Sequence, residues 1–400
     1  MLTADAAPDA AHRPNRQTSM IRLAVQQPSL AKYRIPVFRE LASRPGIDLT
    51  VHYADTPGIP NVEPDGFRAV HTPMQRAGLA GNQAYFHRPQ VSLARRERCD
   101  VLLMGWDLHY ASLVPGLLRA RRNRVGTVLW GHGYSKHERP LRRSLRDKVG
   151  RMADAVLFYN HAAERAAIEA GFDAERVFVA LNSLDQSPIQ AARARWLADP
   201  GRLAAFRHDE GLDGPLILFV SRLDPDNRVD LLLRAAVRLR GRWPTLRVVI
   251  VGKGPHGPEL ERLADELNIR DNVRFQGAIY EEDRLAPWFC AADVFCYPAN
   301  IGLSILHAFG YGLPVITGDR LQAQNPEIEA LRDGENGLLF ADGNERALAA
   351  ALERLIEDDV LRGRLSAEAH RTATEVFTIE RMVDGIVAAA EFAAARAGSR

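Results

Sequence analysis

Residues 297–317 read YPANIGLSILHAFGYGLPVIT and contain one complete structural unit. A short apolar strand and a turn precede a helix that begins near Leu303 or Ser304 and ends within Gly310–Gly312. A buried strand follows. This succession of strand, helix and strand is typical of a parallel α/β sheet. The open amides at the start of the helix would face an anion, with Asn300 and Ser304 as further polar groups.

Two other segments repeat the arrangement of a strand that ends directly before a helix. Residues 219–228 read FVSRLDPDNR, and Arg222 and Arg228 bracket the loop. Paired guanidinium donors at a helix N-terminus suit a diphosphate, although loop arginines are also common surface residues. Residues 251–255 read VGKGP, and their glycines would let the backbone approach a ligand closely. This segment also fits an ordinary turn, and it does not extend to the G-x-G-x-x-G dinucleotide fingerprint.

Apolar runs alternate with amphipathic stretches along both halves of the chain. This alternation predicts an α/β protein with two doubly wound, Rossmann-like domains that face each other across a cleft. A helix is expected over Pro89–Arg98, and a loop with at most one strand over Pro57–Gln83. The expected divisions are a disordered leader at 1–19, an N-terminal domain at 20–184, an interdomain connection at 185–214, a C-terminal domain at 215–375 and a final helix at 376–400. That helix could cross back to the N-terminal domain.

The three segments, in this order and spacing, resemble the nucleotide-binding domain of the retaining family 4 glycosyltransferases, which have the GT-B architecture. The resemblance covers residues 153–357 well and the first half only in layout. It implies that Arg222 grips a donor diphosphate, and that a second positive charge has moved from the position of Asn227 to Arg228. The donor-binding residues that it implies are Arg222, Asn227, Arg228, Gly252, Lys253, Asn300, Ile301, Gly302, Leu303, Ser304 and His307.

The chain departs from the family pattern in the third segment. The family usually shows E-G-F-G-L-x-x-L-E-A, with one glutamate facing the donor sugar and the other holding the ribose. Here Ala299 and His307 occupy the two glutamate positions. His307 could still donate a hydrogen bond to the ribose, and Asn300 could meet sugar hydroxyls. Two interpretations stay open: a subfamily with a shifted donor site, or a binding protein that has lost catalysis.

The first domain is expected to carry the catalytic and acceptor-side residues. His132 lies in a Gly-rich loop just past a strand. The family commonly has a histidine there that contacts the donor sugar, so His132 is the predicted catalytic residue. Tyr33 and Arg34 follow the first strand, and Trp106 and His109 follow another strand. These four residues are predicted to contact the acceptor, the alternative being a packed loop under the cleft.

Positive charge concentrates in the first half of the chain. Residues 1–190 carry 26 Lys and Arg against 18 Asp and Glu, and Arg119–Arg151 contains eleven basic residues against Glu138 and Asp147. Such a patch suits an anionic membrane surface or a phosphorylated acceptor, and equally a solvated helix face. No known nucleic-acid-binding motif is present, which argues against nucleic acid as a partner.

The composition constrains location and cofactors. No run of about 18 apolar residues occurs, so no membrane span is predicted. The three cysteines fit no metal-ligand spacing, and Cys290 and Cys296 lie in an apolar stretch that suggests buried packing. We expect a cytoplasmic protein, peripheral at the inner membrane face if the basic patch binds lipid. No cofactor or metal is expected beyond the nucleotide diphosphate sugar, because Arg222, Arg228 and helix amides are expected to stabilise the charge of the leaving diphosphate.

The resemblance implies an enzyme that moves a sugar from a nucleotide diphosphate donor to a hydroxyl of a glycan or lipid-linked acceptor, with retained anomeric configuration. Cell-surface glycan or glycoconjugate synthesis is the expected setting. A catalytically silent sugar-nucleotide-binding or partner-docking protein of the same fold is the main alternative. Sugar-nucleotide epimerisation is a third, but it needs carboxylate pairs in the cleft, and none is well placed in the sequence.

Overall fold

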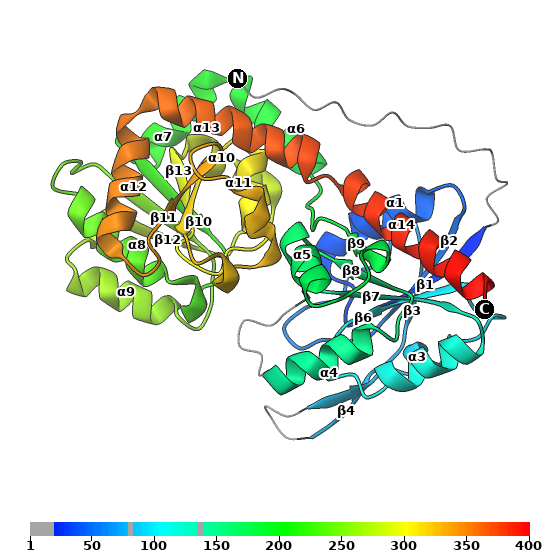
Figure 1. Ribbon diagram of the computed structural model, residues 1–400. Helices are drawn as coiled ribbons and strands as arrows, with labels where there is room; N and C mark the ends of the chain where they lie inside the picture. Colours follow the sequence, from blue (N-terminus) through cyan, green and yellow to red (C-terminus); the bar gives the residue numbers. More distant parts are fainter. Residues whose placement is uncertain (1–19, 79–82, 134–139) are drawn as a thin grey trace, which may run out of the picture.

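The computed structural model describes residues 20–78, 83–133 and 140–400. These residues form two α/β domains, each with a parallel sheet between layers of helices (Figure 1). The predicted fold class is therefore confirmed. The predicted leader at residues 1–19 lies outside the described residues.

The N-terminal domain is built on a seven-stranded parallel sheet, within the described residues, in the order β3-β2-β1-β6-β7-β8-β9. Its strands are β1 (Ile21–Gln27), β2 (Ile47–Tyr53), β3 (Arg68–His71), β6 (Val101–Gly105), β7 (Gly126–Gly131), β8 (Ala155–Phe158) and β9 (Val177–Val179). The chain winds outward from β1 to β3 and then restarts at β6 on the other side of β1. A ligand crevice is expected where the winding reverses, at the carboxyl ends of β1 and β6.

The C-terminal domain repeats this plan with six parallel strands in the order β12-β11-β10-β13-β14-β15. Its strands are β10 (Leu216–Val220), β11 (Arg247–Val251), β12 (Val273–Gly277), β13 (Val294–Cys296), β14 (Val315–Gly318) and β15 (Gly337–Phe340). The winding reverses between β10 and β13. The segments around Arg222 and Asn300, predicted from sequence to bind the donor, therefore follow the two strands that flank this switch point.

Helices cover both faces of the two sheets. The helices of the N-terminal domain are α1 (Ile35–Ser43), α2 (Pro89–Ser92), α3 (Leu113–Arg122), α4 (Pro140–Gly150) and α5 (His161–Glu169). Those of the C-terminal domain are α6 (Ser187–Leu197), α7 (Pro200–Asp209), α8 (Val229–Leu239), α9 (Gly257–Glu266), α10 (Glu282–Ala291), α11 (Ser304–Gly310), α12 (Glu345–Glu357) and α13 (Asp359–Arg371). α6 and α7, which occupy most of residues 185–214, pack against α10.

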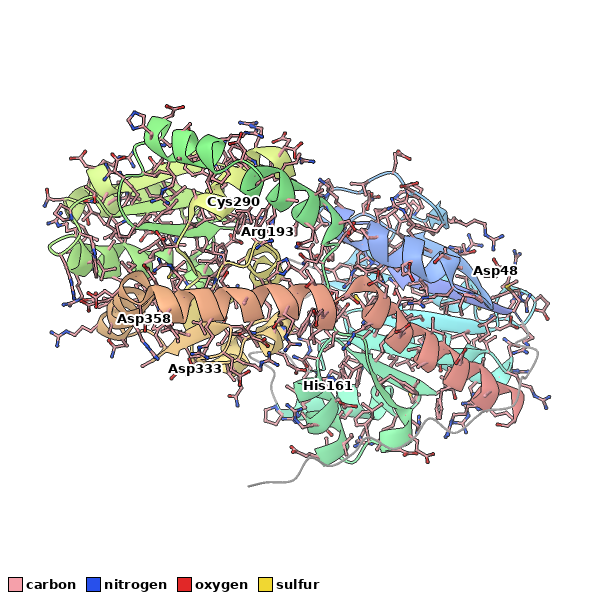
Figure 2. The ribbon with its side chains drawn as sticks, turned by 90° about the horizontal axis from the view of Figure 1, so that it is seen from above. Asp48, His161, Arg193, Cys290, Asp333 and Asp358 are labelled. Carbon is pink, nitrogen blue, oxygen red and sulfur yellow. The ribbon has the colours of Figure 1, made fainter. Side chains whose placement is uncertain are left out.

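The last helix, α14 (Ile379–Gly398), leaves the C-terminal domain and lies against the N-terminal sheet (Figure 2). A π-helical turn at Thr372–Val376 separates it from α13. α14 contacts β7, β8, β9 and α1. At its closest approach, a Cβ added to Gly385 would lie 2.0 Å from the carbonyl oxygen of Val179, so only glycine allows the helix to sit this low. The two domains are thus joined by two separate crossings of the chain.

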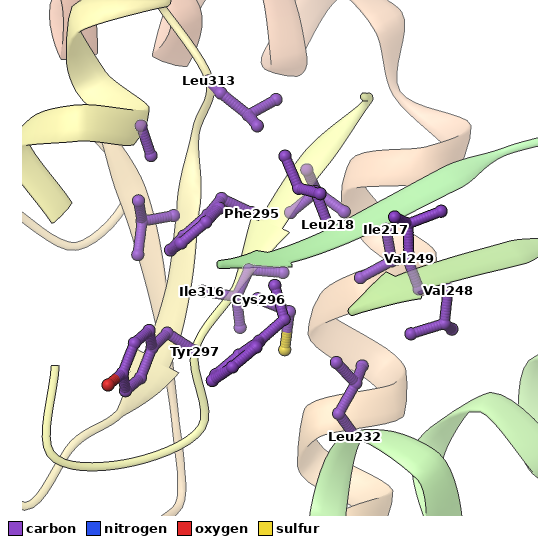
Figure 3. Packing of buried hydrophobic residues seen from close by; sticks show 14 of the residues in the cluster. Ile217, Leu218, Leu232, Val248, Val249, Phe295, Cys296, Tyr297, Leu313 and Ile316 are labelled. Atoms are coloured by element: carbon purple, nitrogen blue, oxygen red, sulfur yellow. The ribbon is translucent and has the colours of Figure 1, made fainter. Parts of the chain in front are cut away.

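The core of the C-terminal domain consists of strand residues packed against the surrounding helices. Ile217, Phe295 and Ile316, on three neighbouring strands, are fully buried (Figure 3). Cys296 is buried among them, and burial raises the pKa of its thiol. Cys290 is partly buried, and burial raises its pKa to about 11. Both thiols are therefore protonated at neutral pH and act as packing groups.

The structure corrects three local expectations. The predicted helix over Pro89–Arg98 is wrong beyond α2, which ends at Ser92. The region expected to hold at most one strand contains both β3 and β4 (Gln75–Ala77), and β4 pairs with β5 (Ala84–Phe86) in a separate antiparallel hairpin. The helix α10 was not expected at all. Pro287 lies inside it and is buried, so a residue that usually ends a helix here packs within one.

Candidate active site

A cleft of about 1220 Å³ opens between the two domains. Its N-terminal wall begins at the switch point of the first sheet, with Gln26 at the carboxyl end of β1 and Trp106 after β6. Its C-terminal wall includes Gly302 and Leu303, between β13 and α11. The cleft therefore joins the ligand-binding edges of both sheets. Among the predicted site residues it brings together Tyr33, Arg34, Trp106, His109, His132, Gly302 and Leu303.

His132 lies in the cleft immediately after β7. Its ring centroid is 4.8 Å from that of Tyr159, which follows β8 and is largely buried. Burial raises the pKa of the Tyr159 phenol, so this group stays protonated and neutral. The imidazole is thus held by packing on one side while it faces the cleft.

Arg34 is a buried residue whose guanidinium lies at the base of the cleft. The group is 4.7 Å from the ring centroid of Trp130, and it donates hydrogen bonds to the Tyr159 hydroxyl at 2.9 Å and to Asn182 Oδ1 at 3.4 Å. Arg34 therefore braces the floor of the site, between the end of β7 and the start of the interdomain connection. Tyr33 beside it is 39% exposed and is free to contact a ligand by its ring.

Trp106 and His109 follow the same strand but occupy different surroundings. The Trp106 ring packs on Phe158 and Phe172 at centroid distances of 5.7 and 5.9 Å, so most of it belongs to the core under the cleft. His109 is partly exposed, and Asp107 and Arg142 hold its ring by hydrogen bonds. Of this pair, His109 is the one with polar atoms available at the surface of the cleft.

On the C-terminal wall, an asparagine ladder shapes the loop that follows β13. Asn300 has a left-handed backbone, with φ of 61°, which asparagine tolerates better than most residues. Its side chain donates to Asn227 Oδ1 at 3.2 Å, and Asn325 donates to its carbonyl oxygen at 2.9 Å. Asn325 lines the cleft beside Gly302. Asn227 and Asn300 therefore set the path of the loop from behind.

Two further predicted residues also support this loop. Ile301 is fully buried, and its backbone N–H donates to Gln324 Oε1 at 2.8 Å. The Ser304 hydroxyl donates to the carbonyl oxygen of Val220 at 3.2 Å, which ties the start of α11 to the end of β10. Neither side chain lines the cleft, and what the loop offers there is Gly302 and Leu303.

Arg222 and Arg228 differ in how firmly they are held. The Arg222 side chain is 64% exposed and lies 3.2 Å from Asp224. Arg228 makes two hydrogen bonds to the Asp230 carboxylate, at 3.0 and 3.2 Å, and these bonds raise its pKa. It borders a smaller hollow of about 460 Å³ together with His256. Arg222 is thus the more mobile cation of the two.

The glycines of the 251–255 segment serve close packing. A Cβ on Gly252 would lie 1.8 Å from the carbonyl oxygen of Ser221, and one on Gly254 would lie 2.2 Å from that of Leu223. The two strand-end loops of β10 and β11 are therefore pressed together backbone to backbone. Lys253, between the two glycines, is exposed at this edge.

His307 lies in a cluster that no sequence signal indicated. Its ring stacks on Phe289 at a centroid distance of 4.6 Å, and its Nε2 is 3.0 Å from Glu282 Oε1. The Tyr311 hydroxyl donates to the same oxygen. Burial alone would raise the pKa of Glu282, but the bonds from His307 and Tyr311 outweigh it and lower that pKa. A carboxylate is thus present next to position 307, supplied by α10.

Glu327 is the carboxylate that sequence reasoning missed in the cleft. It is 5% exposed, lines the cleft and accepts a hydrogen bond from Asn182 Nδ2. A Cβ added to Gly302 would lie 3.7 Å from its Oε2. Two residues later, Glu329 accepts from the backbone N–H groups of His161 and Ala162, at 3.1 and 3.0 Å. The Pro-Glu pair at 326–327 was visible in sequence, but only the fold brings it opposite the N-terminal domain.

No group of three or more His, Cys, Asp or Glu side chains that could hold a metal ion occurs in the part of the chain that the structure describes. In the same residues, no helix is long and apolar enough to cross a bilayer.

Both halves of the chain match models of glycosyltransferase families. Residues 214–358 match "Glycosyl transferases group 1", and residues 37–187 match "Glycosyltransferase Family 4". The first match spans the switch point of the C-terminal sheet, and the second spans His132 and Trp106. Both walls of the cleft are therefore related by sequence to glycosyltransferases.

Curated relatives agree with these matches. The chain is 30% identical over 260 residues to a GDP-mannose-dependent alpha-(1-6)-phosphatidylinositol monomannoside mannosyltransferase of Mycolicibacterium smegmatis, covering 62% of this chain and 65% of the relative. It is 39% identical over 185 residues to a D-inositol 3-phosphate glycosyltransferase of Frankia alni, covering 42% and 44%. The matches thus span about half to two thirds of the length of these relatives.

The fold is shared over nearly the whole chain with a solved structure, Anabaena Alr3699/HepE in complex with UDP. The TM-score is 0.70 at 18% identity, covering 92% of this chain and 98% of that one. At this identity the likeness concerns the fold, which is the GT-B architecture of two facing Rossmann-like domains.

Proposed function

We propose that this GT-B glycosyltransferase moves a sugar from a nucleotide diphosphate donor to an acceptor hydroxyl. The observation that carries the proposal is the cleft itself, where the loop at Gly302 and Leu303 faces His132 across the domain boundary. Relatives named as mannosyl- and inositol phosphate glycosyltransferases, and a neighbour solved with UDP, support a nucleotide sugar as the donor.

The roles follow from the two walls. We expect the diphosphate to lie near Arg222 and the loop after β13, where guanidinium and backbone donors stabilise the charge that develops on the leaving group without a metal ion. The sugar would then lie between this loop and His132. Closure of the domains around it would exclude water and limit donor hydrolysis.

We propose retention of the anomeric configuration, with the leaving phosphate oxygen assisting deprotonation of the acceptor hydroxyl. Glu327 is the only carboxylate of the C-terminal domain that lines the cleft among the described residues, and Asn182 holds it. We expect it to bind hydroxyls of the donor sugar. This is the role of the family glutamate whose position Ala299 occupies here, and an alanine side chain has no polar group for it. An inverted product in an NMR assay of the anomeric centre would overturn this stereochemistry.

The proposal is tested with the full chain and a panel of nucleoside diphosphate sugars. A thermal-shift screen selects the donor, because a ligand that binds only the native state raises its stability. A transfer assay with polyol, glycan and lipid-linked acceptors then follows. His132→Ala should lower kcat about 10- to 100-fold with nucleotide affinity nearly unchanged, the size of one charge-assisted hydrogen bond.

The matched control is His208→Ala, an exposed histidine on α7 far from the cleft. Saturable donor binding with neither transfer nor hydrolysis for any donor would contradict the enzyme. It would favour the alternative, a catalytically silent sugar-nucleotide-binding protein. The replacement of both family glutamates, by Ala299 and His307, is consistent with that alternative.

We also propose that α4 rests on an anionic membrane, consistent with lipid-linked acceptors in glycoconjugate synthesis. Leu141 and Leu145 lie four residues apart on one helical face, 85% and 54% exposed, beside the cations Arg142 and Arg143. Flotation with phosphatidylglycerol vesicles should fall with rising salt and with a Leu141→Gln, Leu145→Gln double substitution. Val360→Gln, equally exposed on the other domain, should change nothing. Salt-independent or absent flotation would count against this membrane contact.

A further inference from the structure

The N-terminal wall carries a rigid polar arm next to the reaction centre. Strand β5 is tied to the loop after β6 by two backbone bonds, from the Tyr85 N–H to the His109 carbonyl at 2.7 Å and from the Ala111 N–H to the Tyr85 carbonyl at 2.8 Å. The rings of Tyr85 and His109 are 6.2 Å apart. Both side chains line the cleft. The arm therefore has a fixed position relative to the strand ends.

Contacts on both ring nitrogens hold His109 and Arg142 together. Arg142 Nη2 lies 2.8 Å from His109 Nε2 and 3.3 Å from Nδ1, and Asp107 Oδ1 lies 2.7 Å from His109 Nδ1. The Arg142 guanidinium therefore lies against the imidazole, and Asp107 fixes the position of that ring at the cleft.

A second guanidinium lies on the other side of Tyr85. Arg76 lines the cleft 6.0 Å from the Tyr85 ring centroid, and it donates to the carbonyl oxygen of Asp55. The Asp55 carboxylate is engaged elsewhere, by His71 and Asn61, each at 2.8 Å. Arg76 therefore reaches the cleft without a carboxylate partner among the described residues.

The N-terminal wall of the cleft consequently carries more positive than negative charge. Arg76 and Arg142 form no ion pair within the described residues, whereas Arg146, above the Trp106 ring, lies 3.6 Å from Asp147. Asp107 is the only carboxylate of the N-terminal domain that lines the cleft in the described residues, and His109 already occupies it. Positive charge gathered in a cleft raises the local concentration of anions. Planar guanidinium groups match phosphate oxygens in pairs.

We infer that Arg76 and Arg142 bind a phosphate group on the acceptor, with Tyr85 and His109 packing between them. This inference rests on the proposed function, because it names the acceptor class of the same cleft. The phosphate could belong to a soluble phosphorylated polyol or to a phospholipid headgroup. The arginines recognise the phosphate itself, so both sources share this chemistry.

The experiment compares acceptors that differ only in the phosphate, with the donor side occupied by UDP or GDP, whichever raises the melting temperature more. Calorimetry measures D-inositol 3-phosphate against myo-inositol, and vesicle binding measures phosphatidylinositol against a galactosyl diacylglycerol, which carries no phosphate. The wild-type chain should prefer the phosphorylated partner by at least tenfold in one arm. Arg76→Gln and Arg142→Gln should each reduce that preference about tenfold. Arg165→Gln, an exposed arginine on α5, is the control that should leave it unchanged.

The two arms identify the source. Preference only for the soluble ester points to a phosphorylated polyol, and preference only for the vesicles points to a lipid headgroup. Equal affinity for charged and neutral partners in both arms, or variants that behave like Arg165→Gln, overturns the inference. Donor turnover measured in parallel separates this failure from failure of the proposed function: a chain that transfers to neutral acceptors keeps the function and loses only the phosphate subsite.

Discussion

The two walls of the cleft are built from different parts of the chain. The N-terminal wall presents long side chains, among them those of Arg34, Arg76, His109 and Arg142, from four separate elements. The C-terminal wall presents a short loop at Gly302 and Leu303 together with Asn325 and Glu327. Behind that loop, the larger predicted residues mainly hold the backbone in place.

This difference explains why the residues of one wall can be predicted from local sequence patterns and those of the other cannot. A wall made of backbone needs particular turns, and turns leave local patterns of Gly, Asn and Pro. A wall made of side chains depends on residues that arrive from distant elements, and no local pattern links them. The proposed donor class therefore rests on short motifs, whereas the proposed acceptor class rests on side chains that only the assembled fold brings together.

The largest expected effect comes from breaking the close backbone packing of the C-terminal domain at Gly252. A Cβ there would meet the Ser221 carbonyl oxygen at 1.8 Å, so Gly252→Ala must separate the β10 and β11 loops. We expect a loss of about 2–3 kcal/mol in the free energy of unfolding, together with loss of nucleotide binding. Gly241→Ala is the control, since nothing lies within 4 Å of a Cβ at that position. Equal urea midpoints for the two variants would refute the close-packed loop.

A similar contrast separates the elements of the fold that could be predicted from the sequence from those that could not. The two sheets were predictable because each buried strand is a continuous apolar run between helical stretches. The helix α10 was not, because Pro287 interrupts its pattern and only tertiary packing keeps the helix intact. With α10 unseen, the Glu282 partner of His307 was unseen as well.

The residues of the candidate site divide in the same way, into those predicted from local patterns and those that depend on the tertiary fold. Gly302 and Leu303, predicted from a local turn, and His132, predicted from a Gly-rich strand end, line the cleft. Glu327 was missed because its approach to Asn182, 145 positions away in sequence, depends on how the domains face each other. Among the predicted donor residues, Asn227, Asn300 and Ser304 were correctly located near the loop, but their hydrogen bonds serve the loop itself.

A second prediction concerns the side-chain wall, which should be sensitive to acid. His87 is fully buried: its Nε2 bonds the Thr72 carbonyl oxygen at 3.1 Å, while its Nδ1 has no partner among the described residues. Burial lowers its pKa to about 4. Its backbone N–H donates to Ser112, and the bonds continue through Gln90 to Gln26 in the cleft. Protonation would thus disturb the wall directly.

The sign follows from linkage. Between about pH 6.5 and pH 4 the unfolded chain binds a proton at His87 that the folded chain does not, so stability falls as the pH falls through this window. The loss should reach about 2–3 kcal/mol by pH 4, with no further loss from this group below it. His87→Gln should remove that part of the slope in urea melts measured across the window. Parallel slopes for the variant and the wild type would show that His87 does not titrate this way.

The smallest expected effect separates Arg222 from Arg228, the two arginines of the segment that follows β10. An exposed ion pair such as Arg222 with Asp224 contributes little, so Arg222 can turn to a diphosphate at low cost, whereas Arg228 is held by two bonds to Asp230. Arg222→Gln should weaken nucleotide diphosphate binding by about 1.5–3 kcal/mol in calorimetry. Arg228→Gln should weaken it less than about threefold, because that guanidinium is already engaged. A larger loss of affinity for Arg228→Gln than for Arg222→Gln would mean that donor binding draws Arg228 away from Asp230. The C-terminal domain would then bind its ligand through a long side chain, as we propose for the N-terminal wall.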